Sequence, residues 1–319
     1  LHAHQGTRAA QESRGLGDVY KRQFEMMVIS LGLMGFFCSI YHPAGLTLIS
    51  HRVDKLTKGM AVHGIFGSTG SALGPILATA VAALISWRAS YAVLGTFNGI
   101  LAISTFFAIP YHRRADIPEE EFANHKEKTN KPALILYFLT NAFLGMAYYG
   151  FTTFMPVHFA DNTNSLLPSM SANMKAGLFP TMVFIAGIGG QLIGAKIGDK
   201  FHKPTALLWI ILANIPFFIL MGYTTDLLLV LSSLLLGVAY FSNQPIGNTL
   251  IAQFTHSQNR GLGYGISFFL SFGIGSLAAG FSGIIAVKMG VSAVFPSMGI
   301  LLIPSVIFGW FMRRAAVRG

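Results

Sequence analysis

The chain has 319 residues, of which 53% are hydrophobic and 11% are charged, and its formal net charge is +10. A soluble domain carries charge on about 25% of its residues, so this composition excludes an ordinary soluble enzyme and indicates an integral membrane protein. The surplus of positive charge is expected in loops on one side of the bilayer, and we expect no binding to nucleic acid. The single cysteine, Cys38, excludes a disulfide within the chain.

The first 23 residues differ in character from the rest of the chain. Residues 13–23 read SRGLGDVYKRQ, and DVYKRQ is the translation of GAT GTG TAT AAG AGA CAG, an adapter sequence used in preparing sequencing libraries. We therefore interpret residues 1–23 as a non-native tail and expect Phe24 to begin the first membrane span. The alternative is a genuine basic cytoplasmic tail, which would invert the topology of every later loop.

Nine apolar runs are long enough to cross about 30 Å of hydrocarbon as helices. They are residues 25–50, 60–86, 89–111, 132–158, 173–195, 204–223, 226–253, 262–287 and 290–312. The loops between them are short except for residues 112–131, which are charged and lack apolar periodicity. This segment is predicted to be a solvated linker between two helical bundles.

Basic residues concentrate in alternate loops, and this sets the predicted orientation. The loops on one side carry Arg52, Lys55, Lys58, Arg113, Arg114, Lys126, Lys128, Lys131, Lys196, Lys200, Lys203, Arg260, Arg313, Arg314 and Arg318, whereas the opposite loops carry Arg88, Lys175 and Lys288. Because loops rich in Lys and Arg stay in the cytoplasm, the 112–131 linker and the carboxyl terminus are predicted to be cytoplasmic.

A short segment of the chain is duplicated 202 residues later. Residues 43–49 read PAGLTLI and residues 245–251 read PIGNTLI, and the same offset pairs Gly35 with Gly237. Duplication inside a membrane protein is typical of secondary transporters. Because the first and seventh spans then correspond, the repeat contains six helices, and we expect the nine spans to be helices four to twelve of twelve, after an amino-terminal truncation.

Several of these segments resemble the major facilitator superfamily, most closely the drug exporters related to the fosmidomycin-resistance transporter. The resemblance is carried by SIYHPAGLTLIS at 39–50, KGMAVHGIFGSTGSALGPILA at 58–78, GIGGQLIGAKIGDKFHKP at 187–204 and RGLGYGISFFLSFGIGSLAAG at 260–280. It implies an all-α membrane protein with two bundles. Residues 24–111 would be a partial amino-terminal bundle of helices four to six, and residues 132–319 a carboxy-terminal bundle of helices seven to twelve.

The fifth helix of the full protein carries regularly spaced glycines, at Gly64, Gly67, Gly70 and Gly74. They are expected to line one face and to let a neighbouring helix approach closely. Pro75 follows and can bend the helix. GSALGP at 70–75 matches the GxxxGP part of the superfamily's antiporter motif, but Ala78 and Thr79 replace its glycine pair, which weakens an assignment as an exporter.

The end of the eighth helix resembles the superfamily's GxxxDxxGRR cytoplasmic motif. The matching residues, Gly194, Asp199, Lys200 and Lys203, are candidates for a cytoplasmic gate, in which an acidic side chain near the amino terminus of another helix forms a charge-assisted latch. Ala195 and His202 stand where the motif has glycines, so a solvated charged turn is the alternative reading.

Proton coupling has few candidates in this chain, because no acidic residue lies near the centre of a span. Histidine has an ordinary pKa near 6.5 and can change charge at physiological pH. His42 precedes Pro43 in a helix and is the proton-coupling candidate. The alternative is that His42 stays neutral and bonds the backbone carbonyl that Pro43 leaves without its helical partner. His63 lies close to the cytoplasmic surface and is expected to be structural.

The resemblance places a substrate cavity between the first, fourth, seventh and tenth helices of the full protein. The polar and aromatic candidates for substrate binding are Tyr41, His42, Asn141, Tyr148, Tyr149, Tyr240, Asn243, Gln244 and Asn248. Tyr148 and Tyr149 cannot face the same direction, because neighbouring positions diverge by about 100° on a helix. None of the nine is Lys or Arg, so an uncharged, zwitterionic or amphiphilic solute is expected.

The predicted function is that of a secondary active transporter, a proton-coupled exporter of a drug-like or small organic compound in the cytoplasmic (inner) membrane. The alternatives are a coupled uptake symporter and a non-transporting membrane fragment. The sequence has neither HExxH nor GxSxG, so an enzyme is not expected. We expect no cofactor and no metal, and we expect a monomer in the lipid bilayer whose partners are the substrate and protons.

Overall fold

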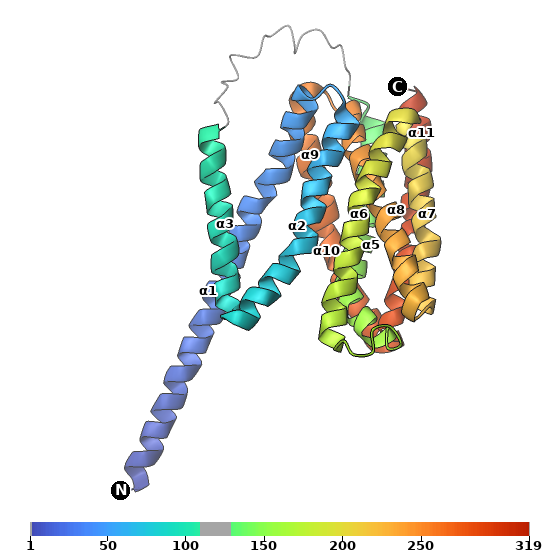
Figure 1. Ribbon diagram of the computed structural model, residues 1–319. Coiled ribbons are helices and arrows are strands. Elements are labelled where there is room, and N and C mark those ends of the chain that lie inside the picture. The colour runs from blue at the N-terminus through green and yellow to red at the C-terminus, as the bar shows by residue number, and fades with distance from the viewer. Residues whose placement is uncertain (1, 109–128, 319) are drawn as a thin grey trace. The chain divides into compact units, whose positions relative to one another are not determined.

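The computed structural model of the protein describes residues 2–108 and 129–318, all of them helical apart from short connections (Figure 1). The long helices are α1 (His2–Arg52), α2 (Leu56–Leu84), α3 (Trp87–Ala108), α5 (Lys131–Asn162), α6 (Ala172–Lys200), α7 (Lys203–Tyr223), α8 (Asp226–Phe254), α9 (Arg260–Phe268), α10 (Gly275–Met289) and α11 (Val294–Arg318). The π-helical segment η3 (Phe269–Ile274) joins α9 to α10, and short 3₁₀ turns, η2 (Ser257–Asn259) and η4 (Val291–Ala293), precede α9 and α11.

The all-α membrane fold is confirmed. Within the described residues, nine helical segments are long and apolar enough to cross a membrane. They are Gln23–Arg52, Leu56–Ala82, Trp87–Ala108, Lys131–Asn162, Ala172–Lys200, Lys203–Tyr223, Asp226–Phe254, Ser257–Met289 and Val291–Val317. Most extend a few residues beyond the predicted apolar runs, because helical hydrogen bonding continues into the polar ends of a span.

The chain divides into two compact units, residues 1–45 and 46–319. In the first unit α1 begins at His2, earlier than Phe24, and its segment Gln23–Arg52 is long and apolar enough to cross a membrane. The predicted division into two helical bundles at the 112–131 linker stays a prediction. That linker lies outside the described residues except for residues 129–131, where the Asn130 side chain caps α5 by accepting a hydrogen bond from the amide of Ala133 (3.2 Å).

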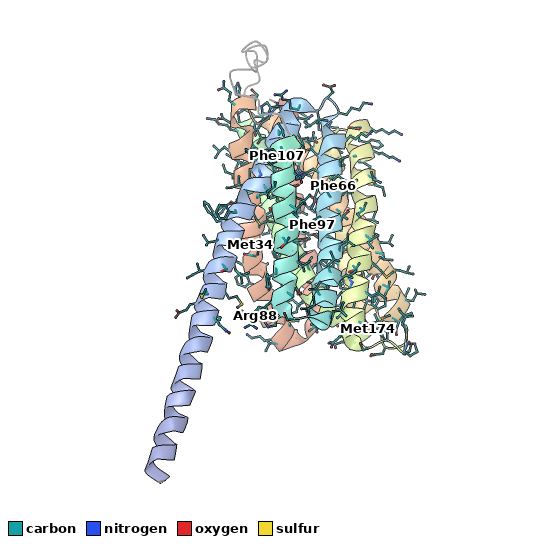
Figure 2. All side chains as sticks on the ribbon, turned by 60° about the vertical axis from the view of Figure 1, so that its left-hand side comes forward. Met34, Phe66, Arg88, Phe97, Phe107 and Met174 are labelled. Atoms are coloured by element: carbon teal, nitrogen blue, oxygen red, sulfur yellow. The ribbon has the colours of Figure 1, made fainter. Side chains whose placement is uncertain are left out.

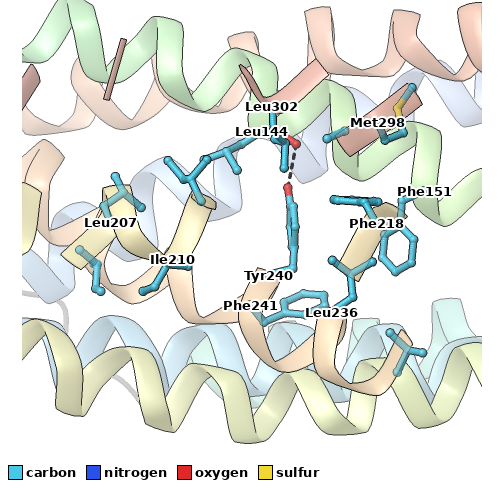
Figure 3. Close-up of a cluster of buried hydrophobic side chains, with 14 of the residues drawn as sticks. Leu144, Phe151, Leu207, Ile210, Phe218, Leu236, Tyr240, Phe241, Met298 and Leu302 are labelled. Atoms are coloured by element: carbon cyan, nitrogen blue, oxygen red, sulfur yellow. Dashed lines mark hydrogen bonds between the residues drawn. The ribbon is translucent and has the colours of Figure 1, made fainter. Parts of the chain in front are cut away.

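The second unit contains one continuous apolar core, contributed mainly by α5, α7, α8 and α11 (Figure 3). Phe151 meets Phe218 edge to face with ring centroids 5.7 Å apart, and Leu236, Met298 and Leu302 are also fully or almost fully buried. Offset and edge-on aromatic contacts of this kind add to the stabilisation from burial. The core fixes α5 and α8 against each other, and these two helices carry seven of the nine predicted substrate-binding residues.

Helices α6 and α8 approach so closely that side chains are excluded from parts of their contact. A Cβ atom added at Gly190 would collide with the carbonyl of Val238, and one added at Gly194 would collide with the carbonyl of Ser242. At Gly237 it would lie 2.6 Å from the carbonyl of Val183. Small residues allow this approach, and the signal in the sequence is the GxxxGxxxG spacing of residues 190, 194 and 198.

The outer faces of α2 and α3 are apolar and exposed, as expected where lipid is the solvent. Phe66 on α2 and Phe97 and Phe107 on α3, which Figure 2 labels, are 70%, 60% and 80% exposed. A hydrogen bond from the Ser90 hydroxyl to the carbonyl of Ala78 (2.8 Å) ties α3 to α2.

Among the described residues, several helix ends that border the predicted basic loops meet at one end of the second unit. Arg260, at the start of α9, donates to the carbonyl of Ser50 (2.8 Å), and the backbone amide of Asn130 donates to the carbonyl of Phe254 (3.0 Å). Asn130 also donates to the carbonyl of Ala315 (3.3 Å) through its side chain. The ends of α1, α8 and α11 and the starts of α5 and α9 therefore share one face, as the alternation of basic loops predicts.

Candidate functional site

An aromatic cluster lies at the middle of the carboxy-terminal helices. The ring of Tyr148 on α5 stacks on that of Tyr240 on α8, with centroids 5.6 Å apart and an interplanar angle of 27°. Phe241 meets Tyr148 edge to face at 6.3 Å. Tyr240 is the central residue of α8, so the cluster lies near the middle of that span.

Tyr148 and Tyr149 have different neighbours, as the 100° rotation between adjacent helical positions predicts. Tyr148 faces Tyr240 and Phe241, whereas Tyr149 meets Phe272 of η3 edge to face, with centroids 6.2 Å apart. The π-helical turn contributes Phe272, and such turns are frequent at functional sites. Sequence reasoning missed Phe241 and Phe272, because phenylalanines in an apolar span are ordinarily core or lipid-facing residues.

Tyr240 is 4% exposed, and its hydroxyl donates a hydrogen bond to the carbonyl of Leu144 (2.8 Å), as Figure 3 shows. In this structure Tyr240 therefore belongs to the packed core, with its polar atom satisfied by α5. Tyr148 and Tyr149 are half-buried and border the same cluster. Contact of these three tyrosines with a substrate stays a prediction.

The predicted carboxamide side chains differ in how far the protein itself uses them. Asn141 donates to the hydroxyl and the carbonyl of Ser267 (2.8 and 3.2 Å) and so ties α5 to α9. Asn243 is buried and donates to the carbonyl of Tyr240 within α8 (2.5 Å). Asn248 is half-buried, and its backbone carbonyl accepts from the hydroxyl of Tyr264 (2.9 Å). Asn141 and Asn243 therefore have clear structural roles in this conformation.

Gln244 forms a pair with Gln191 of α6, a residue that sequence reasoning missed. The Gln191 Nε2 donates to the Gln244 Oε1 at 2.5 Å, and Gln191 is completely buried. Gly64 of α2 lies directly on this amide, because a Cβ atom added at Gly64 would be only 2.5 Å from the Gln191 Oε1. A carboxamide within a predicted span is costly to bury, and that was the available signal.

Tyr41 and His42 belong to the first compact unit. Their rings lie edge to face with centroids 5.1 Å apart, and His42 is half-buried whereas Tyr41 is exposed. Their role in substrate binding, and that of His42 in proton coupling, stay predictions. His63, in the second unit, lines a shallow groove of about 400 Å³ with Ile49, Val53, Lys55, Lys58, Gly59 and Val62 at the start of α2.

Of the four glycines predicted to form one packing face, Gly64 alone touches another helix of the second unit. Around Gly67, Gly70 and Gly74, no atom of that unit lies within 4 Å of an added Cβ, so close packing at these three positions is not seen. The physical reason is the spacing: a step of three residues rotates by about −60°, so Gly70 lies about 120° around the helix from Gly64. The side chain of Pro75 lies outside the described part of the structure.

The predicted cytoplasmic gate residues have unequal surroundings. A Cβ atom added at Gly194 would collide with the carbonyl of Ser242 and would lie 2.9 Å from the ring of Pro245. Asp199 and Lys200 are exposed, and Lys203 is half-buried. Gly198, which precedes Asp199, lies against Thr57 in the first turn of α2. A Cβ atom added at Gly198 would be 2.8 Å from the Cγ2 of Thr57. The end of α6 thus lies beside the amino terminus of α2, as the latch requires, but the latch itself stays a prediction.

A charged contact at this face that was not predicted involves Arg260. Its guanidinium donates to the carbonyl of Ser50, which is in the last turn of α1 and belongs to the second unit. A cation at the carboxyl end of a helix interacts favourably with the helix dipole. Among the described residues, no group of three or more His, Cys, Asp and Glu side chains is placed to hold a metal.

Comparisons with known proteins agree with this architecture. A profile of the Major Facilitator Superfamily matches residues 19–269 and 159–319. The fosmidomycin resistance protein of Escherichia coli (strain K12) is 23% identical over 304 residues, which are 88% of this chain and 70% of that protein. The human organic anion transporter MFSD10 superposes with a TM-score of 0.56 at 20% identity, over 83% of this chain and 66% of that one. The chain thus spans less than two thirds of that solved structure.

Proposed function

Because this chain belongs to the major facilitator superfamily, whose members are membrane transporters and not enzymes, we propose that it exports a drug-like or small organic compound through the cytoplasmic membrane. Transport would proceed by alternating access and be coupled to protons. The nine spans would correspond to helices four to twelve of the superfamily's twelve. The face that carries Lys200 and Arg260 would be cytoplasmic.

The observation that supports this function most directly is the cluster of Tyr148, Tyr240 and Phe241 at mid-helix, next to Tyr149 and Phe272. Aromatic rings bind flat apolar solutes with a defined geometry. Neither Lys nor Arg belongs to the cluster, which favours an uncharged amphiphile over a strong anion. The name of the Escherichia coli relative, a resistance protein, supports the outward direction.

The test is transport by the full-length protein in an efflux-deficient bacterium and in inside-out membrane vesicles. Chloramphenicol serves as an uncharged aromatic probe and fosmidomycin as an anionic one. We expect energised vesicles to accumulate chloramphenicol and collapse of the proton gradient to abolish this accumulation. Tyr148→Leu should reduce the rate about tenfold, because stacking on Tyr240 is lost, whereas Tyr148→Phe keeps it.

Tyr223→Leu is the matched control, because Tyr223 is 79% exposed at the end of α7 and lies away from the cluster. It should transport at the unmodified rate. Gradient-driven uptake of the probe by whole cells would instead support the symporter alternative, for which the missing glycine pair at Ala78 and Thr79 is the sequence argument. The absence of transport of both probes in both preparations would contradict the proposal.

A further inference from the structure

Two buried polar atoms at the contact between α2 and α6 have no hydrogen-bond partner among the described residues. They are the Oε1 of Gln191 and the hydroxyl of Ser68, and these side chains are 0% and 3% exposed. A buried donor or acceptor without a partner costs about 1–3 kcal/mol, so native proteins seldom keep one without a reason. Both atoms belong to the contact between α2 and α6, so a polar ligand that reached them would make hydrogen bonds that the described protein leaves unmade.

Ser68 faces α6 at this point of α2. It lies one turn after Gly64, which covers the Gln191 amide, and one turn before Ala72, whose carbonyl accepts a hydrogen bond from the hydroxyl of Thr181 on α6 (3.5 Å). Residues four apart lie on the same side of a helix. The neighbouring Thr69 bonds the carbonyl four residues earlier, whereas the Ser68 hydroxyl does not.

The three helices reach this point at the same depth. Gly64 lies eight residues into α2, and Gln191 and Gln244 lie nine and ten residues before the ends of α6 and α8. At about 1.5 Å per residue, all three are about 12–15 Å from the face that carries the basic loops. The contact is therefore on the path between the aromatic cluster and the proposed cytoplasm.

The polar atoms adjoin the aromatic cluster. Gln244 follows Phe241 by three residues and Tyr240 by four, so it shares their side of α8. Gly187, one turn before Gln191 on α6, packs directly on the ring of Phe241. A molecule whose aromatic part meets Phe241 would thus have its polar part near Gln191.

We propose that Gln191 and Ser68, with Gln244, form a subsite for an uncharged substrate group that both donates and accepts hydrogen bonds, such as a hydroxyl or an amide. Gln191 offers an acceptor, and the Ser68 hydroxyl offers a donor and an acceptor. Gly64 is a glycine because α2 must lie directly on the Gln191 amide when the subsite is closed. This inference rests on the transport function proposed above and specifies the class of compound.

The decisive variant is Ser68→Ala, because its hydroxyl bonds nothing else in the described structure. Removal of an unpaired buried hydroxyl should leave thermal unfolding of the full-length protein unchanged or slightly improve it. If the hydroxyl binds substrate, the Kd of radiolabelled chloramphenicol should rise about five- to tenfold. Gln191→Leu should weaken binding at least as much.

Asn214→Leu is the matched control for Gln191→Leu. Asn214 is also a fully buried carboxamide whose oxygen lacks a partner in the described structure, but it lies on α7 and donates to the carbonyl of Ile210 (2.7 Å). The Kd of Asn214→Leu for chloramphenicol should equal that of the unmodified protein. Wild-type binding in Ser68→Ala and Gln191→Leu would overturn the inference and indicate a water-filled polar pocket only. If Tyr148→Leu alone weakened binding, the inference would fail while the proposed function stood. If the unmodified protein transported fosmidomycin but did not bind chloramphenicol, the inference would again fail alone, and if it bound and transported neither probe, both would fail.

Discussion

Arg260 and the gate residues show how single side chains acquire their roles. Asp199 and Lys200 match a family pattern, yet both are exposed, whereas Arg260 reaches the carbonyl of Ser50 at 2.8 Å. The guanidinium contacts the end of a helix that is 210 residues away in the sequence. A charged hydrogen bond of this kind is stronger than a neutral one, so Arg260 joins α9 to α1 at the proposed cytoplasmic face.

His42 and His63 give a prediction at the scale of single residues. His42 precedes a proline within a predicted cavity-lining helix, where protonation can accompany alternating access. In the full-length protein, His42→Gln should reduce chloramphenicol transport driven by an imposed pH gradient roughly tenfold, with binding little changed. His63→Gln should retain coupling. Proteoliposome flux and equilibrium binding measure the two effects, and an unchanged response to the gradient in His42→Gln would assign that residue a structural role.

At the scale of helices, small residues determine which faces pack. On α2 the small residues that are buried or lie directly on α6 are Thr57, Ala61, Gly64, Ser68 and Ala72, and the larger Met60 is buried beside them. Steps of four, three, four and four residues keep this stripe within about 80° of the helix circumference. The predicted stripe of glycines shares one member with it, because a glycine marks a close contact only where another helix is present.

The glycines of α6 provide a test at this scale. Gly190→Ala places a Cβ against the carbonyl of Val238, which cannot move away easily, so it should destabilise the protein by about 1–3 kcal/mol. Gly189→Ala is the matched control, since no neighbouring atom of the second unit lies within 4 Å of its Cβ and alanine favours a helix. Thermal unfolding in detergent compares them. Equal stability of the two variants would mean that α6 and α8 are farther apart than described.

At the scale of the molecule, the contact between α2 and α6 joins segments from the two predicted repeats. It runs from Thr57 beside Gly198, through Gly64 on Gln191, to Ala72 bonded by Thr181. Alternating access requires relative movement of the two halves of such a transporter. In the proposed mechanism, this contact, which extends over about half of the length of α2, has to slide or open during transport.

A reversible cross-link tests this movement. In a Cys38→Ala background, Thr57→Cys and Gly198→Cys should form a disulfide, because the Thr57 Cγ2 lies 2.8 Å from a Cβ added at 198. Oxidation should reduce transport by the full-length protein roughly tenfold or more, and a reductant should restore it. The two single-cysteine variants control for the substitutions. Full activity of the cross-linked protein would show that this contact stays fixed during transport.

The sequence by itself determined the nine spans, the alternation of basic loops and the polar positions within the helices. Each of these follows from local hydropathy and charge, because every span must by itself be long and apolar enough to cross the bilayer and must satisfy its own backbone hydrogen bonds. Tyr148 and Tyr149 were also expected to diverge, since helical rotation is a local property.

Only the tertiary structure decided which of these positions meet. The pairing of Gln191 with Gln244, the cover by Gly64 and the contact of Arg260 with Ser50 join helices that are distant in the sequence. Apolar spans are alike in composition, so hydropathy does not specify which face of one helix packs against which face of another. That choice depends on side-chain size and hydrogen bonding at each helix contact.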